Sequence, residues 1–169
     1  MKDKTPLYHY PASYAQEHGE FEQYQASFQS NIACRKAIEK AINDHYCDYI
    51  LGDGALQDIL KQFDYERIFF VLAVTVRNKN WDGRISHDNK LWAQTISVFH
   101  DKDGSSFDRN TYFVVDRAHP GLVNIFLSMV RREYERSQEK KTSVHESLNK
   151  QQTKKLTEQT PRQRKMPER

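Results

Sequence analysis

Apolar residues almost disappear from this chain after residue 139, and that change limits how much of it can fold around a core. Between residues 140 and 169 the apolar side chains are Val144, Leu148, Leu156 and Met166, set among Lys, Gln, Thr, Arg and Glu. Such a segment buries too little apolar surface to offset the entropy lost on ordering. The sequence therefore predicts one globular domain at 1–139 and a basic, disordered tail at 140–169.

Charge divides the chain at the same place. Residues 140–169 hold nine Lys or Arg and three Glu, whereas the whole chain carries a net charge of +3. The globular part is therefore mildly acidic, with a net charge of −3, and is not expected to bind nucleic acid through a basic surface. The tail either contacts phosphates or only solubilises the chain. Its candidate nucleic-acid-binding residues are Lys150, Lys154, Lys155, Arg162, Arg164 and Lys165.

The sequence also indicates a compartment. The start of the chain leads into no apolar segment of the kind found in signal peptides. The longest apolar run, 68–76, is much shorter than the ~20 residues that a membrane helix needs. We therefore expect a cytoplasmic protein with no membrane partner, in which Cys34 and Cys47 stay reduced.

Apolar periodicity predicts a compact, mainly α-helical bundle. Ser13 is placed to cap a short helix that ends at Gly19. Apolar and small residues at three- to four-residue spacing predict a long helix over 20–46. Asp53, between two glycines, is then placed to cap a helix over 54–63.

The segment 65–78 is apolar on all sides, so periodicity alone does not separate a buried helix from a buried strand. Its β-branched and aromatic residues favour a strand. Its length, and the acidic residues Asp64 and Glu66 at its start, favour a helix. We predict a helix.

The remaining elements are shorter or less regular. Ser86 or Asp88 is placed to cap a further helix. A small β-hairpin is predicted near 98–115, and Pro120 is expected to open a last helix that ends near Gln138. We expect the helix after Ser86 to turn these residues inward: Leu91, Trp92, Thr95 and Ile96.

Catalytic and metal-binding motifs are not recognised. The histidines form no His-x-x-x-His pair and the cysteines no Cys-x-x-Cys pair. His87 with Asp88, and His100 with the acids that follow it, are candidate metal ligands, but helix-start polarity and loop solvation explain them equally well. Cys34 lies beside an apolar helix face, which is typical of a core residue rather than of a nucleophile. We predict no catalytic residue, no metal and no cofactor.

The most distinctive stretch runs from Trp81 to Trp92. In a structural interpretation, Asp82 and Ser86 satisfy backbone groups, the intervening Gly83 takes a positive φ, and Arg84 pairs with an acid such as Glu66. In a functional interpretation the stretch recognises a partner, because Trp and Arg are frequent anchors at interfaces. The candidate partner-binding residues are Trp81, Asp82, Arg84, His87, Asn89, Lys90 and Trp92.

A second polar group lies on the long predicted helix. Ser27, Asn31 and Arg35 follow one another at four-residue spacing, beside the apolar face. Residues so placed either bind a partner or hold another helix through hydrogen bonds. The sequence leaves both interpretations open.

Several of these patterns together resemble a domain family of unknown function that is carried by conjugative elements, plasmids and phages of Gram-positive bacteria. The resemblance covers residues 7–135. It is most specific in the stretch Asp82-Gly83-Arg84-Ile85-Ser86-x-x-Asn89-Lys90-x-Trp92-Ala93. It brings no established chemistry, but it implies an accessory protein of mobile DNA, and inhibitors of host defence are common among such proteins.

These observations predict a non-enzymatic binding protein that inhibits a host defence nuclease of the RNA-guided kind, that is, an anti-CRISPR protein. An acidic body suits the basic nucleic-acid channel of such a nuclease, and the basic tail suits the guide RNA or DNA. Two alternatives stay open. One is a nucleic-acid-processing enzyme that uses His87, Asp88, His100 or His119, and the other is a docking module for conjugation or replication proteins.

Overall fold

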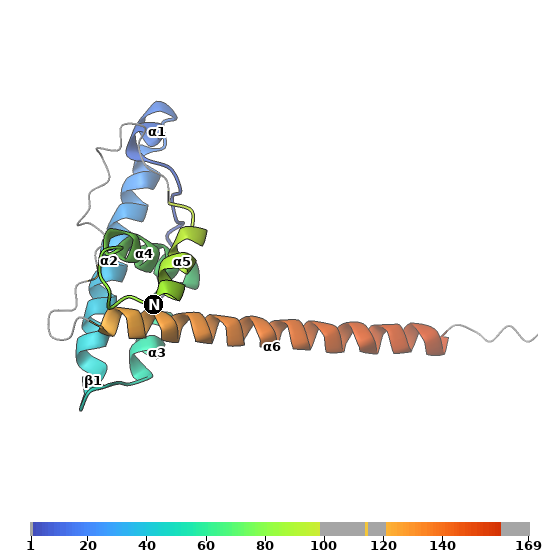
Figure 1. Cartoon of the computed structure of the whole chain (residues 1–169). Coiled ribbons are helices and arrows are strands. Elements are labelled where there is room, and N and C mark those ends of the chain that lie inside the picture. The colour runs from blue at the N-terminus through green and yellow to red at the C-terminus, as the bar shows by residue number, and fades with distance from the viewer. Residues whose placement is uncertain (1, 99–113, 115–120, 160–169) are drawn as a thin grey trace, which may run out of the picture. The chain divides into compact units, whose positions relative to one another are not determined.

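The structure is a computed structural model that describes residues 2–98, 114 and 121–159. Contacts divide the chain into two units, Met1–Arg131 and Arg132–Arg169. The described residues are mainly helical, as predicted. Their elements in chain order are α1 (Ala12–Glu17), α2 (Phe21–His45), β1 (Tyr46–Cys47), β2 (Ile50–Leu51), α3 (Gly54–Leu60), α4 (Tyr65–Asn78), α5 (His87–Thr95) and α6 (Leu122–Gln159) (Figure 1).

Helix α2 confirms the long helix predicted over 20–46. Its buried residues recur every three or four positions, because only one face of the helix meets the rest of the unit. The first half of this face is polar and the second half is apolar. The buried residues are Ser27, Ser30, Asn31, Cys34, Ile38, Ala41 and Ile42.

Helix α4 settles the assignment of the segment 65–78, which is helical as predicted. All of its residues from Phe70 to Val76 are buried, which explains why the apolar run shows no amphipathic period. The Thr75 hydroxyl donates to the carbonyl of Val71 and accepts the backbone N–H of Val114, so this polar side chain is satisfied inside the core.

The core of the first unit brings together helices from both ends of the sequence. Ile38 and Ile42 of α2 and Ile59 of α3 lie in one cluster with α4. The first turns of α6 complete that cluster with Leu122, Val123, Phe126, Leu127 and Val130.

Several predicted caps and boundaries differ from the structure. The residue before α1 is Pro11, not Ser13, and Ser13 lies inside the helix. Asp53 does precede α3, but its side chain makes no capping hydrogen bond. Helix α3 stops at Leu60, three residues before the predicted end. The end of the first helix agrees better, because Gly19 follows it with a φ of 68°.

Two predictions near the end of the domain lie outside the described residues: most of the hairpin near 98–115, and the helix start at Pro120. The sheet that the described residues do contain is elsewhere. Strands β1 and β2 pair in antiparallel fashion, with Cys47 opposite Ile50.

Helix α6 continues to Gln159, well past the predicted end near Gln138. Its sequence has no Gly or Pro between Leu122 and Gln159 and is rich in Lys, Glu, Gln and Leu, which have high helix propensity. Residues 140–150 are exposed throughout, so the helix adds no core there. The start of the predicted tail therefore falls inside α6, and residues 160–169 lie outside the described part.

Candidate protein-binding surface

The turn that leads into α5 is built around Asp82. This residue is only 4% exposed, and one of its carboxylate oxygens accepts the backbone N–H of Arg84 at 2.9 Å. The Arg84 guanidinium donates to both oxygens, at 2.9 and 2.8 Å. The hydrogen bond from the Arg84 side chain, more than any other factor, lowers the pKa of Asp82 to about 2. The acid that pairs with Arg84 is therefore its near neighbour and not Glu66.

Gly83 does not take the positive φ that the sequence predicts. Among the described glycines, Gly19 is the one with a φ in the left-handed region. A Cβ atom added to Gly83 would contact nothing within 4 Å. Asp82 forms the turn through its side chain, so the backbone at position 83 needs no special conformation.

Ser86 caps α5 as predicted. Its hydroxyl accepts the backbone N–H of Asn89 at 3.2 Å, and its own N–H donates to the side-chain oxygen of Asn124 at 2.9 Å. The cap thus also attaches the start of α5 to the start of α6.

Asn89 lies at the centre of this attachment and is 1% exposed. Its side-chain N–H groups donate to the side-chain oxygen of Asn124 at 2.7 Å and to the hydroxyl of Ser128 at 3.1 Å. Its side-chain oxygen accepts from the guanidinium of Arg131 at 2.7 Å. That guanidinium also lies 5.7 Å from the centroid of the Trp92 ring. These bonds fix the orientation of α5 on the domain.

The candidate partner-binding residues therefore divide by exposure. Asp82 and Asn89 are buried in the framework, and Lys90 and Trp92 are half-buried. Trp92 packs edge-on against Phe69, with ring centroids 5.2 Å apart. The exposed candidates are Trp81, Arg84 and His87, and Trp81 is 77% exposed.

Of the four residues expected to point inward from α5, Leu91 and Thr95 are exposed instead. The buried residues of this short helix are Asn89 and Ala93. The prediction is therefore right for Trp92 and Ile96, which pack against the core, and wrong for Leu91 and Thr95, because the buried amide of Asn89 determines which face of the helix meets the domain. Leu91 is 54% exposed and adds an apolar residue near Trp81 in the sequence.

The polar group on α2 is a structural lock. Arg67 is 4% exposed and donates to the carbonyl of Ser27 at 3.1 Å, to the side-chain oxygen of Asn31 and to the carbonyl of Thr5 at 2.9 Å. The Ser27 hydroxyl accepts the backbone N–H of Tyr8 at 3.0 Å. Together these bonds hold the N-terminal segment and α4 against α2.

Arg35, the third member of that group, is not part of the lock. It pairs with Glu39 one turn further along α2, at 3.3 Å. The neighbouring Cys34 is fully buried, as predicted, and burial raises the pKa of its thiol to about 12. A thiol in this state is a poor nucleophile at neutral pH.

The β1–β2 hairpin is an exposed feature that sequence reasoning missed. It follows the end of α2 (Figure 1), and its turn residues Asp48 and Tyr49 have φ values of 51° and 64°. Tyr49 is 89% exposed and Ile50 is 69% exposed. Two-residue strands carry no readable alternation, and the turn lacks the Asn-Gly or Asp-Gly pair that marks such hairpins. The signal that could have revealed this exposed feature was the apolar pair Tyr49 and Ile50, which lies in the segment between the helices predicted over 20–46 and 54–63.

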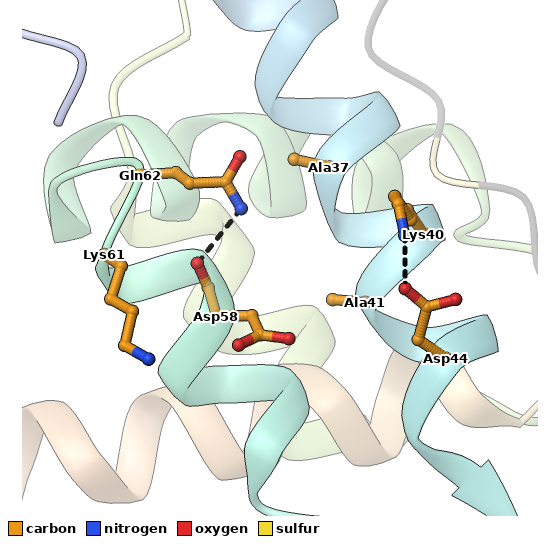
Figure 2. Close-up of a pocket in the computed structure, with 7 residues that line it drawn as sticks. All are labelled: Ala37, Lys40, Ala41, Asp44, Asp58, Lys61 and Gln62. Atoms are coloured by element: carbon orange, nitrogen blue, oxygen red, sulfur yellow. Dashed lines mark hydrogen bonds and ion pairs between the residues drawn. The ribbon is translucent and has the colours of Figure 1, made fainter. Parts of the chain in front are cut away.

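A pocket of about 240 Å³ lies between α2 and α3 (Figure 2). Its two carboxylates are already paired within the chain. Asp44 lies 2.5 Å from the Lys40 ammonium, and Asp58 lies 2.6 Å from the His45 ring. The His45 hydrogen bond lowers the pKa of Asp58. This arrangement joins the end of α2 to α3 at the base of the hairpin.

The described residues offer no ready metal site, because no three of their His, Cys, Asp and Glu side chains come together in a suitable arrangement. His87 and Asp88 are both exposed at the start of α5. His100 and His119 lie outside the described part of the chain.

Comparison with known families places the turn and its helices within a single family domain. Residues 7–135 match the family described as "Protein of unknown function (DUF3849)". The chain belongs to this family. The DUF3849 match has the same extent as the predicted resemblance and ends just beyond Val130, the last core residue of α6. No curated protein and no solved structure matches the chain.

Among the described residues, no helix combines the length and the apolar character that crossing a bilayer demands.

Proposed function

We propose that this DUF3849 protein is a mobile-element accessory protein that binds and inhibits a host defence nuclease, with RNA-guided nucleases as the first candidates. The proposal is for a stoichiometric binding protein and not for an enzyme. The partner would be the nuclease itself or its complex with guide RNA. The role of conjugative elements, plasmids and phages as carriers is part of the same proposal.

The observation that best supports a binding role is the exposure of Trp81 on a rigid support. A Trp that is 77% exposed costs solubility, and such residues are frequent anchors at protein interfaces. The turn that carries Trp81 is fixed by the buried side chains Asp82 and Asn89, so it loses little conformational entropy on binding.

Charge supports the choice of a nuclease as partner. RNA-guided nucleases hold their nucleic acids in positively charged channels, and the first 139 residues of this chain carry a net charge of −3. The basic residues beyond residue 139 would contact guide RNA or DNA phosphates. Lys150 is exposed on α6, where such a contact is sterically open.

The test is inhibition of a purified RNA-guided nuclease by the purified protein. We expect Trp81→Ala to weaken inhibition at least tenfold and Trp81→Phe to weaken it less, because Phe retains part of the apolar area. Val144→Ala, which removes another exposed apolar side chain (60% exposed), is the matched control and should have no effect. Equal inhibition by the wild type and Trp81→Ala would exclude this turn as the anchor.

The enzyme alternative has its own readout in the same experiment. The protein is incubated with RNA or DNA and a divalent metal ion, without the nuclease. Cleavage that is lost in His87→Ala would contradict a purely binding role.

A further inference from the structure

We infer that the tip of the β1–β2 hairpin, residues Asp48, Tyr49 and Ile50, is a second docking element, which inserts into a positively charged protein surface. The inference names a contact surface for the proposed function and rests on it. It is carried by the exposure of the tip, by how the hairpin is held, and by the charge around it.

The tip exposes more apolar surface than its place in the fold requires. Tyr49 is 89% exposed and Ile50 is 69% exposed, although the neighbouring Leu51 is 8% exposed and belongs to the core. A Tyr at the end of a hairpin has the reach and the amphipathic character of an interface anchor.

The backbone presents this pair at an energetic cost. Asp48 and Tyr49 both occupy the left-handed region, with φ values of 51° and 64°, where a side chain with a Cβ atom is strained. Glycine would relieve that cost at position 49, but it would also remove the ring. The turn therefore keeps a bulky, exposed aromatic side chain in a backbone conformation that favours glycine.

The base of the hairpin is held firmly, so the tip is a preformed element. Tyr46 packs against the core, and the backbone N–H of Gly52 donates to the carbonyl of His45 at 2.9 Å. The His45 ring in turn contacts Asp58 of α3 at 2.6 Å. Preformed tips lose little entropy when they bind.

Charge identifies the kind of partner. Within residues 41–60, Asp44 pairs with Lys40 and Asp58 pairs with His45, so the negative charge that can face a partner comes from Asp48 and Asp53. Asp48 and Asp53 are exposed on either side of the apolar pair. This surface favours a partner with an apolar pocket edged by Lys or Arg. It disfavours nucleic acid, because phosphates would be repelled, and it disfavours a second copy, because like charges would face each other.

The test measures binding to a purified RNA-guided nuclease, first without and then with guide RNA. We expect Tyr49→Ala to raise the Kd at least tenfold, and Tyr49→Phe to raise it less. We expect Asp48→Asn with Asp53→Asn to raise it about threefold and to reduce its dependence on salt. Asn tolerates the left-handed region, and Asp53 makes no cap bond, so the fold should be unchanged.

The matched charge control is Glu17→Gln with Glu22→Gln, which removes two exposed acids, one at the end of α1 and one in the first turn of α2, and should leave the Kd unchanged. Light scattering of the free protein tests self-association. A wild type that does not bind the nuclease overturns both proposals. If the wild type binds the nuclease and Tyr49→Ala binds it equally well, the inference about the hairpin is overturned and the proposed function is not. Tyr49-dependent binding to guide RNA alone, or a dimer that Tyr49→Ala dissociates, would also overturn the inference, because the tip would then have a different partner.

Discussion

Asn89 shows how one residue of the distinctive motif acts through the framework and not through a partner. Asn89 is 1% exposed, and its side-chain amide forms hydrogen bonds with Asn124, Ser128 and Arg131. We expect Asn89→Ala to lower the free energy of unfolding by about 2–3 kcal/mol, because it leaves buried groups of α6 unsatisfied. Urea denaturation measures the change. The nearby Leu91→Ala, at an exposed position, should stay within about 0.5 kcal/mol of the wild type.

Arg67 has the corresponding role at the other side of the domain. Replacing it with Met removes the donors to Thr5, Ser27 and Asn31 and costs about 2 kcal/mol or more, since three acceptors lose a buried, charged donor. Hydrogen exchange should then show lost protection at the Tyr8 amide, which donates to Ser27. Unchanged exchange at Tyr8 would show that the N-terminal segment is held by other contacts.

Asp82 makes the stability of the turn depend on pH. Its pKa falls from 3.8 to about 2 in the folded state, so the unfolded state binds the proton more tightly. The stabilisation is complete above pH 3.8 and is lost as the pH falls toward 2. We expect Asp82→Asn to lower the Tm at pH 7 and to lower it much less at pH 2. Equal losses at both pH values would contradict an ionised Asp82 in the fold.

Among the elements, the β1–β2 hairpin is the one where we expect a single substitution to change the stability of the fold and the affinity for the nuclease in opposite directions. We expect Tyr49→Gly to raise the free energy of unfolding by about 0.5–1 kcal/mol, because Gly adopts a φ of 64° without strain. The same change should weaken binding to the nuclease as much as Tyr49→Ala does. Thermal denaturation and the binding assay together check the two directions. A less stable Tyr49→Gly would show that the ring stabilises the turn.

The elements also show what a sequence can predict. The apolar period of α2, and the length and acidic start of α4, were sufficient to predict these two helices, because each helix carries its own signal over many residues. Asn89 was assigned to the surface because its partners lie 35 to 42 residues away, on another helix. Sequence alone likewise could not show that Trp81 is exposed while the adjacent Asp82 is buried, because this depends on which side of the turn meets the core.

At the scale of the molecule, the core ends at Val130, whereas the helix continues to Gln159. Residues 140–150 are exposed, so deletion of 140–169 should leave the Tm of the first unit within a few degrees. It should also reduce the binding of nucleic acid at low salt, since it removes nine Lys and Arg residues. Calorimetry and a salt titration measure the two effects. A large fall in Tm would show that the distal half of α6 contributes to folding.

Inhibition by binding, without catalysis, fixes how much of the protein is needed to stop the nuclease. This requirement is measured by a titration of nuclease activity, at enzyme concentrations far above the Kd, with the purified wild-type protein. We predict a linear loss of cleavage that reaches its end at equimolar amounts, with no cleavage of nucleic acid by the protein alone. Complete inhibition at strongly substoichiometric amounts, or metal-dependent cleavage by the protein itself, would contradict the claim and indicate an enzyme.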